Sequence, residues 1–365
     1  MKTIIIPAGQ SIDPYLKQNR EPGTTFHLER GTYYTAGAFD FEPFDLCMLA
    51  PGCTLLGEGS TRTRIVLMNP KVTHGGKPTN YVEALTGGAR SKGRSESMFM
   101  SGFTLSMGEY TGPTVGVHVW SSGAVIRDLH VEDIVGYRTW PTHPNEGFGI
   151  ILENAFESGL RFEGGGEITE CKVIMKRGVG ENYSTGIAVG TVRRDVPLLT
   201  TVVSLCIVVA QDAHCGFAFS DHVDIQMCET YGTKRAIFAD TKPIRNSRVI
   251  GMLAQDVAWA MELRSSVSKE MRSGIILKGC CFRFMNHVGY SQALVLSDDS
   301  KDGSAVFENI VLEDCTFVQD LAGRGSMGRV SGPRVNQVME TGNIWAGKWE
   351  APVIQNHASP WSYDP

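Results

Sequence analysis

The sequence contains no long apolar run, no basic stripe and no C-x-x-C pair, and each absence excludes a class of function. Its apolar runs are far shorter than a membrane helix, so no transmembrane segment is expected. The formal net charge is −5, and without a basic stripe we expect no nucleic-acid or anionic-membrane partner. An acidic sugar remains compatible with this charge, because a local Arg or Lys suffices to bind one.

The cysteines and the N-terminus exclude further classes. Nine cysteines, an odd number without metal-ligand spacing, indicate neither a disulfide framework nor a zinc site. The opening "MKTIIIPAGQ" is too short for the apolar core of a signal peptide. We therefore expect a cytoplasmic protein as the chain stands, or a secreted one if a leader was removed. The sequence requires no cofactor and leaves monomer or homo-oligomer open.

Glycine, in contrast, is abundant. The 365 residues include 41 glycines, which favours a turn-rich, all-β chain over a helical one. A chain of this length is expected to form one large domain or two ordinary domains.

Seven segments share one pattern: a small residue, an alternating apolar triplet and a polar corner. They begin at residues 116, 149, 186, 216, 236, 260 and 293, which lie 20 to 37 residues apart. Each is followed by a second alternation, such as "VDIQMCETY", and the length variation falls in the loops. Recurrence at this short period predicts a solenoid, in which each unit buries its face against its neighbours.

Aligning the second alternations places small or apolar residues in one interior column, because alternate residues of a strand share a face. This column is Leu129, Cys171, Cys206, Cys228, Ser247, Cys280 and Cys315. The column two residues on is Val131, Val173, Val208, Thr230, Val249, Phe282 and Phe317. Five cysteines are thereby predicted to be structural interior side chains rather than redox groups.

The first alternations give an inward and an outward column. The inward one is Val117, Ile150, Ile187, Phe217, Ile237, Met261 and Leu294, and the outward one is Trp120, Glu153, Gly190, Ser220, Asp240, Arg264 and Ser297.

These columns, with the motif G-I-x-L-x-x-S-x-x-V-x-I-x-x-C-x-I, resemble the right-handed parallel β-helix proteins of the pectin-lyase-like superfamily. "SIDPYLKQN" before "PGTTFHLERGTYYT" is similar to the capping helix and first turn of that superfamily, and "CTLLGEGSTRTRIVL" is similar to its next coil. The resemblance implies an all-β, single-stranded right-handed parallel β-helix with an N-terminal helical cap. It covers residues 1–320 and identifies no family within the superfamily.

Two segments depart from the repeat. Residues 321–365 are irregular and carry three tryptophans, and we interpret them as a C-terminal cap or wrap of the same domain. Residues 68–98 are polar and glycine-rich, which predicts a long excursion from the coils that is either functional or poorly ordered.

The connections that precede each first strand hold many of the His, Tyr, Trp and acidic residues, and loops on a rigid scaffold often carry function. By resemblance to the polygalacturonase-type glycosidases, the catalytic candidates are Asp212, His214, Asp256 and Arg264. Asp212 and Asp256 precede strands two coils apart, which is roughly 9.6 Å and near the upper end of the separation that inverting glycosidases use. The motifs N-T-D, D-D and R-I-K are absent, so the resemblance stops at the superfamily.

Further candidates are predicted to bind the substrate: Glu153, Tyr183, Tyr231, Lys234, Asp240, Trp259, His287 and Tyr290. No metal ligands are predicted; Glu153, Asp240 and Glu262 give calcium only weak support, by comparison with the aspartate cluster of pectate lyases. For every candidate a structural role competes, such as a turn aspartate or an ion-paired surface arginine.

Three functional hypotheses follow. The first is a carbohydrate-active enzyme: a glycoside hydrolase, a polysaccharide lyase or a uronate epimerase. The second is a non-catalytic glycan-binding or structural β-helix of the tailspike kind. The third is a biosynthetic enzyme with a small non-sugar substrate.

Overall fold

The computed structural model describes most of the chain. The described residues are 2–38, 47–71, 73–74, 77–78, 81–88, 97–140, 143–153, 165–176, 182–190, 199–239, 244–265, 271–284, 291–298, 305–319, 325–331, 334–335, 337–355 and 361–362. They form two compact units. The N-terminal unit comprises residues 1–202 and 206–213, and the C-terminal unit comprises residues 203–205 and 214–365.

A short helix, α1 (Asp13–Gln18), lies at the start of the N-terminal unit. Pro14 fits its first turn, where the missing N–H has no intrahelical partner to lose. Leu16 is buried, and the Asp13 carboxylate accepts hydrogen bonds from Thr35 Oγ1 and the Ala36 amide at 2.7 and 2.8 Å. The predicted N-terminal capping helix is therefore confirmed. Within the described ranges, no helix is long and apolar enough to cross a membrane.

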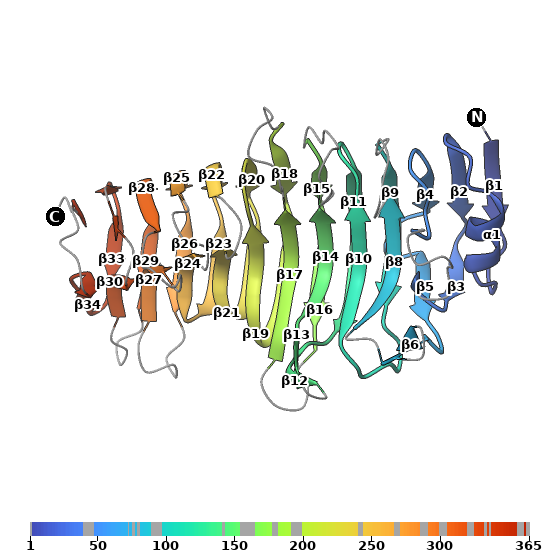
Figure 1. Cartoon of the computed structure of the whole chain (residues 1–365), viewed down its shortest axis with the longest axis horizontal. Helices are drawn as coiled ribbons and strands as arrows, with labels where there is room; N and C mark the ends of the chain where they lie inside the picture. Colours follow the sequence, from blue (N-terminus) through green and yellow to red (C-terminus); the bar gives the residue numbers. More distant parts are fainter. Residues whose placement is uncertain are drawn as a thin grey trace. The chain divides into compact units, whose positions relative to one another are not determined.

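Parallel strand pairing builds the N-terminal unit. In Figure 1, β8, β10, β14 and β17 run side by side, and these strands are the first strands of successive coils. The strands that belong to this unit are β1 (Lys2–Ile6), β2 (Thr24–Leu28), β3 (Gly31–Thr35), β4 (Thr54–Gly57), β5 (Thr63–Leu67), β6 (Thr73–His74), β7 (Lys77–Pro78), β8 (Val82–Gly88), β9 (Phe99–Ser106), β10 (Thr114–Trp120), β11 (Val125–Ile134), β12 (Tyr137–Trp140), β13 (His143–Asn145), β14 (Gly147–Glu153), β15 (Glu167–Thr169), β16 (Lys172–Met175) and β17 (Asn182–Gly190). β18 (Thr201–Ser204) and β19 (Ile207–Phe219) each contribute to both units.

The C-terminal unit repeats the same architecture. Its first strands are the second half of β21, then β24, β27 and β30, which pair in parallel and in register. The strands of this unit are β20 (Val223–Gln226), β21 (Glu229–Ala239), β22 (Ile244–Ile250), β23 (Leu253–Val257), β24 (Trp259–Ser265), β25 (Met271–Lys278), β26 (Cys281–Phe284), β27 (Ser291–Asp298), β28 (Val306–Glu313), β29 (Thr316–Val318), β30 (Gly325–Ser331), β31 (Arg334–Val335), β32 (Val338–Thr341), β33 (Ile344–Ala346), β34 (Trp349–Glu350), β35 (Val353–Gln355) and β36 (Trp361–Ser362).

The cysteine column is confirmed, with one correction of register. Cys171, Cys206, Cys228, Cys280 and Cys315 are all reduced and buried. The member predicted as Ser247 is Met252, because Glu229 pairs with Leu253 and Leu253 pairs with Cys281. Ser247 and Val249 instead lie on β22, the strand before β23 in the same coil, where Arg248 pairs with Asp224 of β20. Asn246 has a positive φ, as do Gly274 and Asn309 in register with it, so this corner recurs in successive coils. The sequence alignment mistook it for the corner at Gly251, which precedes Met252.

Each cysteine thiol points back at the main chain of the coil before it. Cys171 and Cys206 donate to the carbonyls of Ile126 and Ile168 at 3.7 and 3.6 Å. In the C-terminal unit, Cys228, Cys280 and Cys315 do the same to Val203, Val249 and Leu277 at 3.6, 3.5 and 3.6 Å. A small apolar side chain with a weak donor suits this position, since carbonyls have a second lone pair to fill.

The small residue that opens each repeat is required by a close approach inside the coil. A Cβ added to Gly116 or Gly149 would lie 2.4 or 2.3 Å from a γ-methyl of Val131 or Val173. A Cβ at Gly216 would lie 2.5 Å from Thr230 Oγ1. Thus the glycines of the first strands lie close to the inward residues Val131, Val173 and Thr230.

Residues 82–88 correct the excursion expected at 68–98. They form β8, which is buried along its whole length and pairs in parallel with β10. Part of this stretch therefore completes a coil rather than leaving it. Its small residues caused the error: Gly87 and Gly88 end a strand that is buried along its length.

The tail is more regular than the sequence indicated. β30 pairs with β27, β32 with β28 and β33 with β29, all in parallel. Trp345 stacks on Phe317 with ring centroids 4.2 Å apart, and Phe317 stacks on Phe282. Described strands after residue 320 thus continue the coils, and Trp345 extends the aromatic column. The proposed boundary at residue 320 stays a prediction.

The burial of the cysteine column predicts its reactivity. In native protein, a thiol reagent should label about one site, Cys281, which is the half-exposed cysteine, whereas all nine should react in denaturant. Counting labels by intact-mass spectrometry checks this. Rapid native labelling of Cys171 or Cys280 would contradict the inward orientation.

The close approach at Gly149 predicts a coupled stability effect. Gly149→Ala should lower the free energy of unfolding by about 1–3 kcal/mol through overpacking against Val173. Adding Val173→Ala removes the clashing methyls, so the double variant should lose less stability than the sum of the single losses. Urea unfolding of the four proteins measures this, and strict additivity would contradict the contact.

Candidate functional site

The outward face of the first strands carries polar groups in the N-terminal unit. Val117 and Val119 of β10 are buried inward, so His118 and Trp120 between and after them point outward. Register places His118 beside Ile151 and Trp120 beside Glu153. In the following coil the equivalent positions are Ala188 and Gly190.

Three side chains from three successive coils meet on this face. We call Glu83 (β8), His118 (β10) and Glu153 (β14) the Glu–His–Glu cluster. His118 Nδ1 lies 2.8 Å from Glu83 Oε1, and His118 Nε2 lies 3.6 Å from Glu153 Oε2. Trp120 stacks on the imidazole with ring centroids 3.5 Å apart.

The three groups differ in exposure. The Glu83 side chain is 1% exposed, that of His118 8% and that of Glu153 19%. Glu153 is therefore the member that a substrate reaches first, and Glu83 lies beneath the imidazole. An ionised carboxylate is costly to bury without hydrogen-bonding partners. The contact with His118 therefore lowers the cost of burying Glu83.

The contacts fix the imidazole tautomer. An ionised carboxylate only accepts hydrogen bonds, so the Nδ1 hydrogen is donated to Glu83. Nε2 then faces Glu153 Oε2 at 3.6 Å. A carboxylate that orients a histidine, which in turn faces the reacting position, is an arrangement used for proton transfer.

A second group of charged side chains lies on the first strands of the C-terminal unit. Arg235 Nε donates to Glu262 Oε2, and Arg235 Nη1 lies 3.2 Å from His214 Nδ1. The guanidinium lies 4.4 Å from the ring centroid of Trp259 and 5.2 Å from that of Phe238. The Arg235 and Glu262 side chains are only 13% and 8% exposed, so this pair neutralises two buried charges.

Asp212 and Asp256 lie at corners of the coil. Both are exposed and have positive φ, 57° and 54°, a region that Asp adopts more readily than most residues. Gln255 pairs with Tyr231, so Asp256 is at the same coil position as Gly232. Gly232 also has a positive φ, 68°. The backbone conformation alone accounts for an aspartate at each corner. Their catalytic role stays a prediction.

The other predicted residues lie in varied settings. Arg264 is half-buried at the end of β24, and Lys234 is half-buried in β21, where its carbonyl accepts the Ala258 amide. The Tyr231 hydroxyl donates to Glu229, which raises the pKa of that phenol to about 12. Tyr183 is half-buried in β17. Asp240, His287 and Tyr290 lie outside the described residues.

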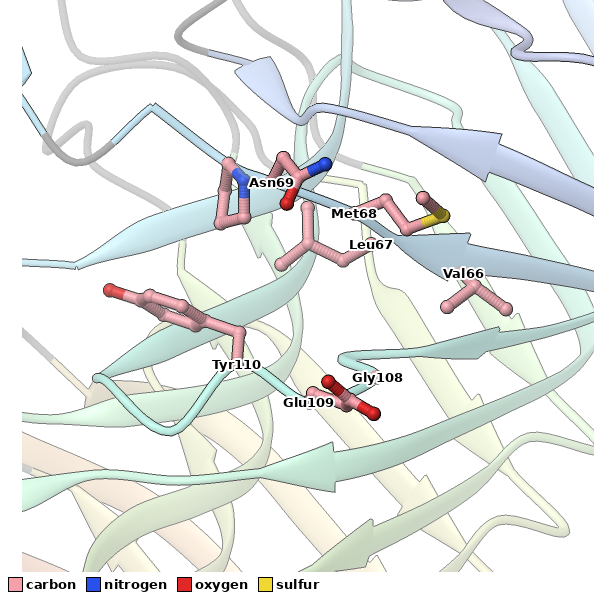
Figure 2. A pocket seen from close by; sticks show the side chains of 8 residues that line it. Val66, Leu67, Met68, Asn69, Gly108, Glu109 and Tyr110 are labelled. Atoms are coloured by element: carbon pink, nitrogen blue, oxygen red, sulfur yellow. The ribbon is translucent and has the colours of Figure 1, made fainter.

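A pocket of about 530 Å³ lies in the N-terminal unit where β5 ends. In Figure 2, Leu67 and Asn69 come from this end of β5, and Glu109 and Tyr110 come from the turn after β9. Burial raises the pKa of the Tyr110 phenol, so the hydroxyl remains a hydrogen-bond donor at neutral pH. None of the predicted substrate-binding residues lines this pocket.

Sequence reasoning missed His118 and Glu83. His118 occupies the centre of "GVHVW", a polar residue between inward valines, and this alternation was the available signal. Glu83 lies in the stretch that was interpreted as an excursion. Among the described residues, no group of three or more His, Cys, Asp or Glu side chains could hold a metal ion.

No family model and no curated protein matches the chain. Solved structures do match. A tailspike protein mutant of E. coli bacteriophage HK620 is 12% identical, with 97% of this chain and 62% of that chain covered and a TM-score of 0.60. The catalytic domain of a GH87 α-1,3-glucanase in complex with tetrasaccharides is 11% identical, with 99% and 69% covered and a TM-score of 0.53.

The A-module of mannuronan C-5 epimerase AlgE4 from Azotobacter vinelandii is 14% identical, with 93% of this chain and 91% of that chain covered and a TM-score of 0.47. Identities this low establish the fold alone. The strand pairing and these likenesses together show that the chain has the right-handed parallel β-helix fold that its sequence resembles.

Proposed function

We propose that the protein is a carbohydrate-active enzyme whose proton-transfer centre is the Glu–His–Glu cluster. One observation carries this proposal: a histidine lies between a buried and a partly exposed carboxylate on the outward face of the coils. A purely structural ion pair needs one carboxylate for each imidazole, and this histidine has a carboxylate at each ring nitrogen.

Each member then has a distinct role. Glu153, the exposed member, exchanges a proton with the glycan. His118 Nε2, 3.6 Å away, supplies or receives that proton after a small approach, as is common for catalytic contacts before substrate binds. Glu83 is a positioning residue, because it holds the Nδ1 hydrogen and so directs Nε2 toward Glu153.

The surroundings of Glu153 provide space for a sugar ring. Its neighbour in the preceding coil is Trp120, and its neighbour in the following coil is Gly190. Glycine has no side chain, so a ring could lie close to the strand on that side of the carboxylate.

The solved structures with this fold support the choice of substrate class. One is a glucanase catalytic domain whose complexes contain tetrasaccharides or nigerose. These are properties of that protein, and fold alone does not transfer an activity. They support the proposal only together with the cluster.

Two alternatives remain testable. A non-catalytic glycan-binding protein of the tailspike kind would present aromatic faces, but Trp120 is 8% exposed and covered by His118. An enzyme with a small non-sugar substrate would use the pocket beside Tyr110, whose volume lies in the range of small-molecule sites.

Replacing the exposed carboxylate tests the proposal. Glu153→Gln should lower turnover by at least about a hundredfold with the melting temperature nearly unchanged, because Gln keeps the shape but cannot transfer the proton. Reducing ends and absorbance of unsaturated products, measured on a panel of polysaccharides, distinguish hydrolysis from elimination.

Matched substitutions serve as controls. Glu313→Gln alters a half-buried glutamate paired with Lys278 and should leave turnover unchanged. Asp212→Asn and Asp256→Asn conserve the corner conformation and test the competing two-carboxylate hypothesis. If one of these lowers turnover a hundredfold and Glu153→Gln does not, the two-carboxylate hypothesis with His214 and Arg264 replaces the Glu–His–Glu cluster.

The positioning role of Glu83 predicts a spectroscopic change. Glu83→Gln should lower kcat more than it raises KM, and it should alter the tautomer of His118 because an amide can donate to Nδ1. The ¹⁵N chemical shifts of the His118 ring nitrogens report this directly. Unchanged ¹⁵N shifts together with a loss of activity would show that Glu83 acts in another way.

A further inference from the structure

Trp120 is an outward aromatic residue that is almost closed to solvent. It ends β10 and lies on the same face as His118, two residues before it. Its ring stacks on the imidazole with centroids 3.5 Å and planes 29° apart, and the residue is only 8% exposed. An outward tryptophan often stacks on a ligand, but here the histidine occupies that ring face. The role of Trp120 is therefore to be sought inside the Glu–His–Glu cluster.

Strand geometry does not impose this stack. Residues two apart on one strand have Cα atoms roughly 6.6 Å apart, and their side chains stand nearly perpendicular to the sheet. Rings 3.5 Å apart must therefore lean toward each other over Val119, whose side chain is buried on the other face. This separation is also shorter than the usual 4.5–7 Å of aromatic pairs. An attraction between the two rings accounts for the contact.

The location of one proton decides the chemistry of the cluster. The Nδ1 hydrogen of His118 is donated to Glu83. A second proton can lie on Nε2, which gives an imidazolium facing an ionised Glu153, or on Glu153, which gives a neutral imidazole facing a carboxylic acid. Both states have the same total charge, so the surroundings select between them. The strand neighbours Thr86 and Ile151 carry no charge, whereas the ionised Glu83 favours the cation.

The indole ring favours the same state. Its face is the negative end of the ring quadrupole, and tryptophan attracts cations more strongly than the other aromatic side chains do. Burial alone favours the neutral pair, but Glu153 keeps 19% exposure and the buried Glu83 carboxylate is better compensated by a cation. The attraction to the indole is stronger in a site that water hardly reaches. Trp120 and Glu83 thus act in the same direction.

We propose that Trp120 is a positioning residue that keeps the shared proton on His118 Nε2 and so leaves Glu153 ionised, as a base directed toward the substrate. The proposal rests on the proposed function for what this base does. The location of the proton, however, is a property of the free protein and can be measured without a substrate.

NMR of the full chain tests this. The ¹⁵N shifts of the His118 ring nitrogens, assigned with His118→Gln, should show both nitrogens protonated at neutral pH. Trp120→Leu removes the ring face and should shift the ratio of the two states about tenfold toward the neutral imidazole, seen as a bare Nε2. Trp120→Phe, with a weaker ring face, should give a smaller shift, and it supplies the measurement if the leucine variant does not fold.

A matched control and a pH profile separate this role from packing. Trp345→Leu removes a tryptophan that stacks on Phe317 in the C-terminal unit, and it should leave the His118 shifts unchanged. With a substrate, the acidic limb of the kcat profile should move to higher pH in Trp120→Leu, because Glu153 must then lose the proton before it can act as a base. A packing role alone would lower kcat equally at every pH.

Four outcomes would overturn the proposal: a bare Nε2 in the wild-type protein, unchanged His118 shifts in Trp120→Leu, an equal change in Trp345→Leu, or a loss of turnover that does not depend on pH. The spectra need no turnover. They therefore decide the location of the proton even if Glu153→Gln keeps full activity and the proposed function fails.

Discussion

The structure depends on one constraint: each coil must lie on the next at the spacing that parallel backbone hydrogen bonds impose, about 4.8 Å. A coil of different cross-section would break the ladders on all its sides. This is why similar side chains occupy the same inward position in successive coils. Cysteines recur in one column, and Phe282, Phe317 and Trp345 stack on one another in the next. The same constraint requires glycine where Val131 and Val173 face the first strands, since one methyl there would separate two backbones.

The constraint also decides where chemistry can lie. Inward positions must be apolar or small, so charged groups gather on the outward face or at corners. Where a charge is nevertheless buried, a partner from the neighbouring coil neutralises it, as with Arg235 and Glu262, or Glu83 and His118. Removing one partner of such a pair costs roughly 3–5 kcal/mol, so these contacts tie adjacent coils together. A rigid stack therefore holds facing side chains in fixed geometry without needing a deep cleft.

Sequence reasoning could predict the columns because they follow from period-2 alternation, a local property. The inward first-strand column from Val117 to Leu294 is confirmed in each unit by the pairing of its described members. Prediction failed where the turn chemistry was unusual. The corner at Asn246, which recurs at Gly274 and Asn309, was mistaken for the corner before the cysteine column, and the glycines of β8 made a buried strand look like a loop. Both errors concern the length of a coil, which the sequence encodes only through its corners.

The candidate site could not be predicted in the same way, because it is formed by residues 35 apart, such as Glu83 and His118, that meet only when two coils stack in one register. The sequence search looked for acidic residues in loops, where aspartates are common for conformational reasons. Asp212 and Asp256, like Gly232, have a positive φ, so corner geometry favours a residue type that also suits catalysis. A side chain that the backbone does not require is more informative. No corner or core position needs a histidine between two glutamates, and the contact with the imidazole offsets part of the cost of burying Glu83 beneath His118. Functional residues in this fold are therefore best sought where a buried side chain lowers stability and the stacking of the coils does not require it.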